Sequence, residues 1–138
     1  MFVRETPSAV LVQAGFQQIG GWTQTARGGI TPSGRAPREP GVYAFVLDGI
    51  AVYVGSTSGS LQNCMYQYQR GDAGQKTRAR INGLIKVSPG GRRVEILVAT
   101  PHASEWNGLP VSTTAGLEVG LIQMIRPAWN ILLGQSKG

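Results

Sequence analysis

The sequence predicts an α+β domain built on a small, mainly antiparallel sheet of three strands that is flanked by helices and preceded by an N-terminal arm. Two runs of β-branched and aromatic residues, 42–47 and 50–54, flank Asp48-Gly49, a strong signal for a two-residue hairpin. A third such run follows at 93–100. Hydrophobic residues make up 41% of the 138 residues, which is enough for one modest core.

The segment before the hairpin is expected to be an arm, residues 1–39, that lies outside a main domain of residues 40–138. A short helix is predicted at 8–14 and a short strand at 16–22. Residues 25–40 are rich in glycine, proline and arginine, a composition typical of an irregular loop.

Helices are predicted after the hairpin from their caps and their apolar spacing. Ser60 is a good N-cap for a helix over 61–70. A second helix is predicted over 77–87, with Ile81, Leu84 and Ile85 on one face and basic residues on its flanks. Residues 101–111 are expected to form a long loop. Ser112 or Thr113 would then cap a last helix that ends before Pro127.

The positive charge is concentrated in one part of the chain. The formal net charge is +6, and residues 70–93 hold seven basic residues against Asp72 alone, so the rest of the chain is neutral. A concentrated patch rich in arginine favours a phosphate backbone as the partner, although a solvated face is the simpler alternative. The predicted DNA-binding residues are Arg70, Lys76, Arg78, Arg80, Lys86, Arg92 and Arg93.

The cysteine count and the apolar runs bear on the cellular location. The single Cys64 excludes an internal disulfide and favours a reducing compartment. The start of the chain carries Glu5 and an apolar stretch too short for a signal peptide, and no run is long enough to span a membrane. We therefore expect a cytoplasmic protein with no membrane partner.

Two tyrosines on the predicted hairpin are candidates for chemistry. With a two-residue turn, Tyr43 pairs opposite Val54, and Tyr53 then lies on the other face of the sheet. A bulge or a longer turn would bring both tyrosines to one face. The hairpin alone therefore leaves open whether the two side chains meet or are ordinary packing residues.

Glu118 is the stronger candidate. On the last predicted helix it falls within the apolar stripe of Leu117, Leu121, Ile122, Met124 and Ile125. A carboxylate in such a place needs a cation, a metal ion or hydrogen-bond donors. A metal ligand and a structural ion pair with an arginine are equally good explanations, and a side chain at the edge of the stripe is a third.

Four elements together resemble the GIY-YIG nucleases: GVY at 41–43, YVG at 53–55, Glu118 on a late helix, and Asn130 in the closing "RPAWN". The resemblance runs from about Pro40 to Ile131. It implies hydrolysis of DNA phosphodiesters with a single Mg²⁺ or Mn²⁺ ion held by Glu118.

The resemblance also implies roles for the other residues. Tyr43 would be the general base or would position the attacking water, Tyr53 would shape the site, and Asn130 would support it. Tyr68 matches a polar position on the first helix after the hairpin.

One position departs from the family pattern. The family usually has an arginine three residues after the leucine that opens this helix, and here Leu61 is followed by Cys64. A cysteine supplies no positive charge for the attacked phosphate. Arg70, Arg78 or Arg80 would have to reach in from neighbouring elements.

The sequence therefore predicts a metal-dependent DNA endonuclease whose activity is impaired at Cys64. The main alternative is a catalytically inactive DNA-binding module with the same fold, and a structural domain with an incidental basic face is a third class.

Overall fold

The structure is a computed structural model that describes residues 6–71, 75–87 and 93–130. Its main sheet has five strands in the order β2-β1-β5-β3-β4, and every pairing is antiparallel. The α+β class and the antiparallel pairing are confirmed, but the predicted number of three strands is wrong. The strands are β1 (Gln17–Gln24), β2 (Ile30–Pro32), β3 (Gly41–Leu47), β4 (Ile50–Thr57) and β5 (Val94–Ala99).

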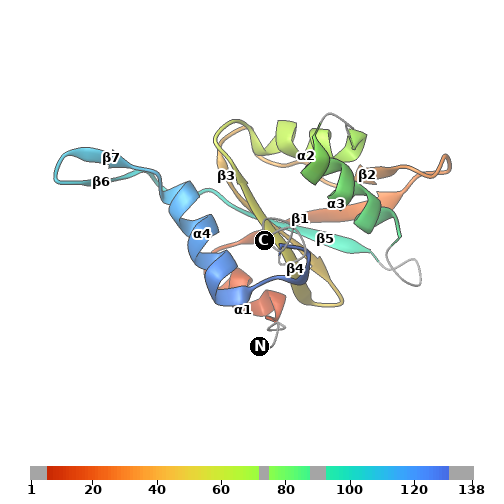
Figure 1. Cartoon of the computed structure of the whole chain (residues 1–138), viewed down its shortest axis with the longest axis horizontal. Coiled ribbons are helices and arrows are strands. Elements are labelled where there is room, and N and C mark those ends of the chain that lie inside the picture. Colours follow the sequence, from red (N-terminus) through yellow and green to blue (C-terminus); the bar gives the residue numbers. More distant parts are fainter. Residues whose placement is uncertain (1–5, 72–74, 88–92, 131–138) are drawn as a thin grey trace.

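Helices cover both faces of the sheet, with α2 and α3 on one side and α1 and α4 on the other (Figure 1). Successive residues of β3 point alternately into the two cores, as the pleat requires. Tyr43 and Phe45 pack with α2 and α3, whereas Val42, Ala44 and Val46 pack with α1 and α4. The helices are α1 (Ser8–Gln13), α2 (Leu61–Arg70), α3 (Lys76–Lys86) and α4 (Thr113–Ile125).

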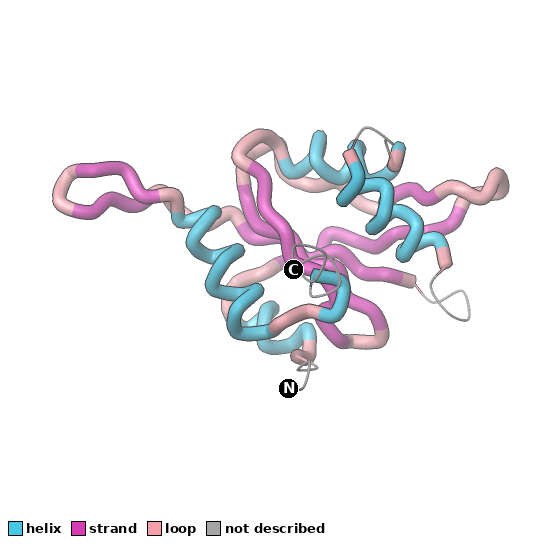
Figure 2. Tube along the Cα trace, in the orientation of Figure 1, coloured by secondary structure: helices cyan, strands magenta, loops and turns pink. Residues whose placement is uncertain are grey.

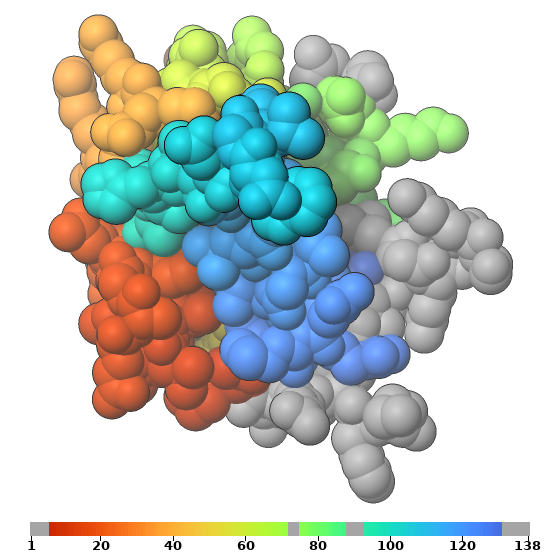
Figure 3. All heavy atoms as spheres, turned by 90° about the vertical axis from the view of Figure 1, so that its left-hand side faces the viewer, coloured from red at the N-terminus to blue at the C-terminus, as the bar shows by residue number. Residues whose placement is uncertain are grey.

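The structure does not show a separate N-terminal arm. Strand β1 pairs with β5 along its length, and β2 extends the sheet beyond β1. Leu11 of α1 and Phe16 are buried in the same core as β3. In Figure 3 the N-terminal segment lies directly beside α4, which agrees with that shared core. The predicted short helix and short strand are present, and the irregular loop contains β2.

The hairpin of β3 and β4 has the predicted turn and an additional bulge. Asp48 and Gly49 have φ values of 55° and 76°, as the two-residue turn of a hairpin requires. Val46 pairs with Ala51, but Phe45 pairs with Tyr53, so Val52 is the extra residue. The bulge shifts the register by one residue and brings Tyr53 to the face of Tyr43.

A second hairpin occupies part of the expected long loop. Strands β6 (Ser104–Trp106) and β7 (Leu109–Val111) pair around an Asn107-Gly108 turn with positive φ at both residues. The hairpin projects away from the body of the molecule beyond α4 (Figure 2). Its Trp106 is 66% exposed. Among the described residues, no helix has the length and apolar character needed to cross a membrane.

Candidate functional site

Three tyrosine hydroxyls meet on the α2 side of the sheet. The hydroxyls of Tyr43 on β3 and Tyr68 on α2 are 2.7 Å apart, and the Tyr68 hydroxyl donates to that of Tyr53 on β4 over 3.3 Å. Because the one Tyr68 proton goes to Tyr53, the Tyr43 hydroxyl must be the donor to Tyr68. The proton of Tyr53 is then left to point out of this chain of hydroxyls.

Two glycines make room for this cluster. A Cβ atom on Gly55 would lie 2.5 Å from both Cζ and the hydroxyl oxygen of Tyr43, which is directly opposite in the ladder. A Cβ on Gly41 would lie 2.7 Å from Cδ1 of Leu61 and would also collide with the carbonyl oxygen of Ala99. Both glycines are therefore required for packing. Gly55 of the YVG tripeptide lets the Tyr43 ring lie over β4, and Gly41 of the GVY tripeptide lets α2 approach the sheet.

Burial keeps the tyrosine cluster uncharged. Desolvation raises the pKa of Tyr43 well above its usual value, and the neighbouring Tyr68 adds to that increase. Burial is also the largest cause of the raised pKa values of Tyr53 and Tyr68. At neutral pH these groups are phenols, so in this state they can donate and accept hydrogen bonds but cannot act as phenolates.

Glu118 lies on α4 and contacts the edge strand β4 from the other face of the sheet. Ser112 caps this helix by accepting a hydrogen bond from the backbone N–H of Ala115. The Glu118 carboxylate accepts a 2.6 Å hydrogen bond from the hydroxyl of Ser56 on β4. It is half-buried, and its negative charge contributes to the raised pKa of Tyr53, after burial. Within residues 6–71, 75–87 and 93–130 it forms no ion pair, which removes the structural ion pair with a described arginine as its explanation.

Asn130 completes the outer edge of β4. Its side-chain amide accepts from the N–H of Val54 at 2.7 Å and donates to the carbonyl of Val54 at 2.9 Å. It thus pairs the backbone of an edge strand as a neighbouring strand would. Farther along this edge, the N–H of Ala51 donates to the carbonyl of Thr6.

Cys64 lies on the buried face of α2 and is 2% exposed. Ser60 caps this helix through the N–H of Asn63, as the sequence predicts. Burial raises the pKa of the Cys64 thiol, and the neighbouring Tyr43 and Arg78 side chains oppose that increase. The guanidinium carbon of Arg78, from α3, lies 6.0 Å from the centroid of the Tyr68 ring. Cys64 therefore has a cation beside it, but that cation comes from another helix.

The predicted basic segment divides into one inward residue and several exposed ones. Arg78 is half-buried against the tyrosine cluster. Arg70 lies 5.4 Å from the ring centroid of Tyr66, on the outer side of α2. Arg92 lies outside the described residues. The remaining members are all exposed to solvent: Lys76, Arg80, Lys86 and Arg93.

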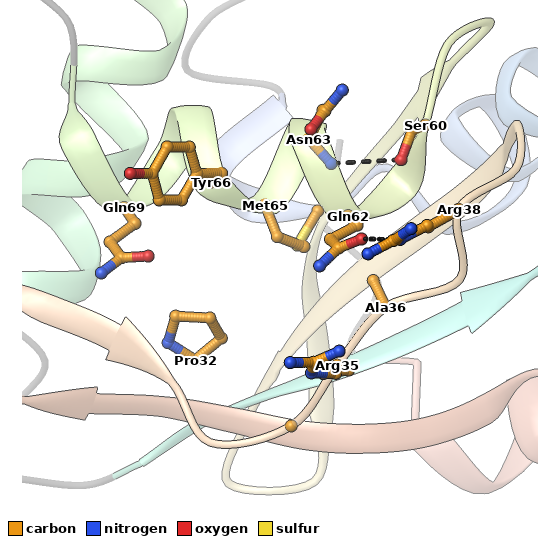
Figure 4. A pocket seen from close by; sticks show the side chains of 11 residues that line it. Pro32, Arg35, Ala36, Arg38, Ser60, Gln62, Asn63, Met65, Tyr66 and Gln69 are labelled. Atoms are coloured by element: carbon orange, nitrogen blue, oxygen red, sulfur yellow. Dashed lines mark hydrogen bonds between the residues drawn. The ribbon is translucent and has the colours of Figure 1, made fainter.

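A hollow of about 620 Å³ lies between α2 and the segment that holds Pro32 and Arg38 (Figure 4). Arg35 and Arg38 line it from one side, and α2 contributes mainly amide and aromatic side chains from the other. Arg38 donates a 2.9 Å hydrogen bond to the side-chain oxygen of Gln62. Tyr66 lines the hollow, but Tyr43, Tyr53, Tyr68 and Glu118 do not, so this hollow is separate from the tyrosine cluster and from Glu118.

Two further residues organise the site and were not predicted from the sequence. Ser56 fixes the Glu118 carboxylate, and Asn82 donates to the carbonyls of Tyr68 and Gln69 at the end of α2, at 2.7 and 3.3 Å. Ser56 directly follows the YVG tripeptide. Asn82 interrupts the apolar face of α3 and is the buried polar residue of the described core.

Solved structures of nucleases resemble this chain. A mutant of EndoII from bacteriophage T4 has a TM-score of 0.70 and 17% identity, over 88% of this chain and 96% of that one. The restriction endonuclease HPY188I, in complex with product DNA, has a TM-score of 0.57 and 14% identity, over 87% and 79% of the two chains. The GIY-YIG N-terminal endonuclease domain of UvrC from Thermotoga maritima, bound to magnesium, has a TM-score of 0.47 and 24% identity, over 68% and 85%.

No protein-family model and no curated protein matches the sequence. The similarity to EndoII and HPY188I covers a larger share of the chain than residues 40–138 alone, so it includes part of the N-terminal segment. The chain has the fold of these endonucleases. The resemblance to GIY-YIG nucleases is therefore confirmed at the level of the fold.

Proposed function

We propose that the chain is a metal-dependent DNA endonuclease that hydrolyses phosphodiester bonds at the outer edge of β4. The observation that carries the proposal is that two unlike groups, a carboxylate bonded to β4 and a tyrosine on β4, flank this edge. The half-buried Glu118 carboxylate has Ser56 as its partner and no described cation, and its charge acts on the Tyr53 phenol. A carboxylate placed beside a hydroxyl donor is suited to hold a metal ion next to a phosphate group.

The donor set fits Mg²⁺ better than a softer metal. Among the described residues, no group of three or more His, Cys, Asp or Glu side chains could form a closed metal site. Mg²⁺ usually keeps several waters and takes one or two carboxylates together with substrate phosphates. Glu118 has a second carboxylate oxygen beyond the one that Ser56 engages, and this oxygen would hold the ion. When bound, the ion would neutralise charge on the phosphate and its leaving oxygen.

The tyrosines would position water and phosphate as neutral groups. The Tyr43 and Tyr68 hydroxyls form a donor chain that fixes the Tyr53 oxygen and leaves the Tyr53 proton free to meet a phosphate oxygen or the attacking water. Because burial raises all three pKa values, a water-positioning role is favoured over a general base for Tyr43. Asn130 would keep β4 in register with this arrangement.

DNA is the expected substrate because of charge and fold. The exposed basic residues of α3 lie on the helix that also carries Arg78, so they can contact the backbone that flanks the bound phosphate. HPY188I, which shares the fold, was solved with product DNA.

A plasmid-nicking assay with Mg²⁺ and Mn²⁺ tests the proposal. The unaltered chain should convert supercoiled plasmid to nicked or linear forms only with the metal present. Glu118→Gln keeps the size of the side chain and should remove the activity, whereas Glu105→Gln on the exposed β6–β7 hairpin should not. Binding of Mn²⁺ can be measured by electron spin resonance as the loss of the signal of the free ion. It should show a site that Glu118→Gln removes and Glu105→Gln leaves intact. Equal Mn²⁺ binding by both variants would disprove the metal assignment.

A second candidate is a catalytically inactive DNA-binding module, and Cys64 is the observation that favours it. The two candidates separate in one experiment. The module would bind duplex DNA with the same salt dependence but would leave the plasmid intact at every metal concentration. Cleavage that depends on Glu118 would exclude the module.

A further inference from the structure

We propose that Arg78 of α3 supplies the positive charge that stabilises the attacked phosphate, in place of an arginine at position 64 of α2. The inference rests on the proposed endonuclease function and assigns one more catalytic residue to the same site. The chain would then be an active enzyme in which the cation comes from a different helix.

The position of Arg78 supports this assignment. Its guanidinium carbon lies 6.0 Å from the centroid of the Tyr68 ring, and Tyr68 shares hydroxyl contacts with both Tyr43 and Tyr53. The Arg78 side chain lies near enough to Cys64 and Tyr53 that its positive charge lowers the pKa of both groups, against the effect of burial. A cation that approaches residue 64 from α3 lies in the region beside the tyrosine cluster, where the guanidinium of an arginine at position 64 would also lie.

The packing of α3 explains why this arginine points inward. Arg78, Ile81, Asn82 and Ile85 follow the i, i+3, i+4, i+7 spacing of one helix face, and the last three are buried. Arg78 is therefore the first residue of the buried stripe. Arg80 is two positions along and is exposed.

Asn82 fixes α3 against the end of α2. Its side-chain N–H groups donate to the carbonyls of Tyr68 and Gln69, which belong to the last turn of α2. Gly71 ends α2 with a φ of 59°, and a Cβ there would lie 2.6 Å from Cγ of Asn82. The close approach of the two helices therefore depends on a glycine at 71 and an amide at 82, and it holds Arg78 over Tyr68.

The other candidate arginines are less suitable. Arg70 is exposed and lies over Tyr66, an exposed ring on the outer side of α2. Arg80 has no contact with the tyrosine cluster among the described residues. Of the three arginines considered in the sequence analysis, Arg78 is the one that the fold brings to the site.

The chemistry assigned to Arg78 involves no proton transfer. In the reaction, a water oxygen bonds to phosphorus, the bond from phosphorus to one sugar oxygen breaks, and that oxygen leaves with a proton that derives from the water. The products are a phosphate monoester and an alcohol. The guanidinium stays protonated and donates to a non-bridging oxygen, where negative charge grows in the transition state.

Single-turnover cleavage by a set of variants tests the assignment. Arg78→Ala should lower the rate at saturating Mg²⁺ by about 10²–10³-fold, as loss of one preorganised donor does. Its affinity for duplex DNA should fall by less than about tenfold, because phosphate contacts are shared among several basic residues. Arg27→Ala removes an equal charge from an exposed site on the β1–β2 turn and should change neither quantity appreciably. Arg78→Lys should keep part of the rate.

Moving the charge is the decisive test. In the Arg78→Ala background, Cys64→Arg should restore the rate at least tenfold, because it places a guanidinium in the same region. In the parent, Cys64→Arg should not raise the cleavage rate, because two guanidinium groups would then lie close together at one buried position and repel each other.

A readout without turnover tests the geometry separately. With [3-¹³C]cysteine the protein gives one Cβ resonance, since Cys64 is the single cysteine. The midpoint of its pH titration should be higher in Arg78→Ala than in the parent, because the positive charge of Arg78 favours the thiolate. Tyr43 also faces this thiol, and Tyr43→Phe serves as the comparison for loss of the other partner. Arg27→Ala should leave the midpoint unchanged.

The possible outcomes separate this inference from the proposed function. Cleavage that Arg78→Ala leaves intact would overturn the role of Arg78 and would leave the endonuclease function standing. Cleavage by Cys64→Arg but not by the parent would also overturn it, because Arg78 would then not replace the missing arginine. Absence of cleavage in the parent, in Cys64→Arg and in the double variant would overturn both.

Discussion

Gly55→Ala is expected to destabilise the protein, although glycine-to-alanine changes in regular structure commonly stabilise. The new Cβ would lie 2.5 Å from Cζ and from the hydroxyl oxygen of Tyr43. The Tyr43 ring cannot easily move, because its hydroxyl is held by Tyr68 and its centroid lies 5.5 Å from that of the Phe45 ring. Overpacking of this kind costs about 1–3 kcal/mol. With a urea slope of about 2 kcal/mol/M, a loss of about 2 kcal/mol lowers the unfolding midpoint by about 1 M.

Gly116→Ala is the matched control, and its effect should have the opposite sign. Gly116 lies in α4, and nothing surrounds the place of its missing Cβ within 4 Å. Alanine there should raise the stability by about 0.5–1 kcal/mol. The two variants therefore differ in the direction of the midpoint shift for the same chemical change.

A double-mutant cycle tests the proposed clash directly. In a Tyr43→Leu background the ring atoms that the new Cβ at position 55 would meet are absent, so Gly55→Ala should cost less there than in the parent. Urea unfolding of the four proteins, followed by circular dichroism, gives the coupling free energy. An equal cost of Gly55→Ala in both backgrounds would refute the explanation.

Three further predictions concern binding and stability. Duplex-DNA affinity should fall steeply as salt rises, and Lys76→Glu with Arg80→Glu should weaken binding to all sequences alike and flatten the salt slope in a filter-binding titration. The urea midpoint of unfolding should fall as the pH rises above about 10, the pKa of tyrosine in the unfolded chain. The reason is that the buried tyrosines have raised pKa values in the folded state, so the unfolded state loses protons first. Tyr68→Phe should make this fall smaller. Asn82→Ala should lower the free energy of unfolding by about 1–3 kcal/mol, since one buried and one partly buried carbonyl of α2 lose their donor, whereas Asn63→Ala at an exposed position of α2 should not.

Local signals in the sequence were enough to place the helices and the central hairpin. Ser60 and Ser112 are both observed caps, and α2 begins and ends where its cap and its glycine predict. The Asp48-Gly49 turn needs two positive φ values, which these residue types tolerate. The Asn107-Gly108 pair carried the same signal for the β6–β7 hairpin and was overlooked.

Register and long-range pairing could not be predicted in this way. The bulge at Val52 has no glycine to mark it, yet it decides whether Tyr53 faces Tyr43. The pairing of β1 with β5 joins segments more than seventy residues apart, and no local pattern encodes such a partner. Strand β1 was predicted as a strand but not as a member of this sheet, and β2 lies in a segment whose composition is typical of an irregular loop.

The inward position of Arg78 could be predicted from local sequence signals only in part. Its spacing from Ile81 and Ile85 places it on the buried face of α3, so a strict count of helical positions would have distinguished it from Arg80. The spacing does not say what that face meets. The contact with Tyr68 depends on the angle between α2 and α3, and Asn82 and Gly71 fix that angle through contacts between segments.

The place of the site in the sheet follows from β4 being an edge strand. Tyr53 and Ser56 point to opposite faces of β4, one toward α2 and the other toward α4. On a central strand, two groups on opposite faces would be separated by the strands on either side. Because β4 is an edge strand, the charge of Glu118 can still raise the pKa of Tyr53 from the other face. An open edge invites pairing with another chain, and here Asn130 and the Thr6 carbonyl occupy its hydrogen-bonding groups at Val54 and Ala51. Loss of the Asn130 amide should therefore affect both the geometry at Tyr53 and the tendency of β4 to associate, because one side chain serves both purposes.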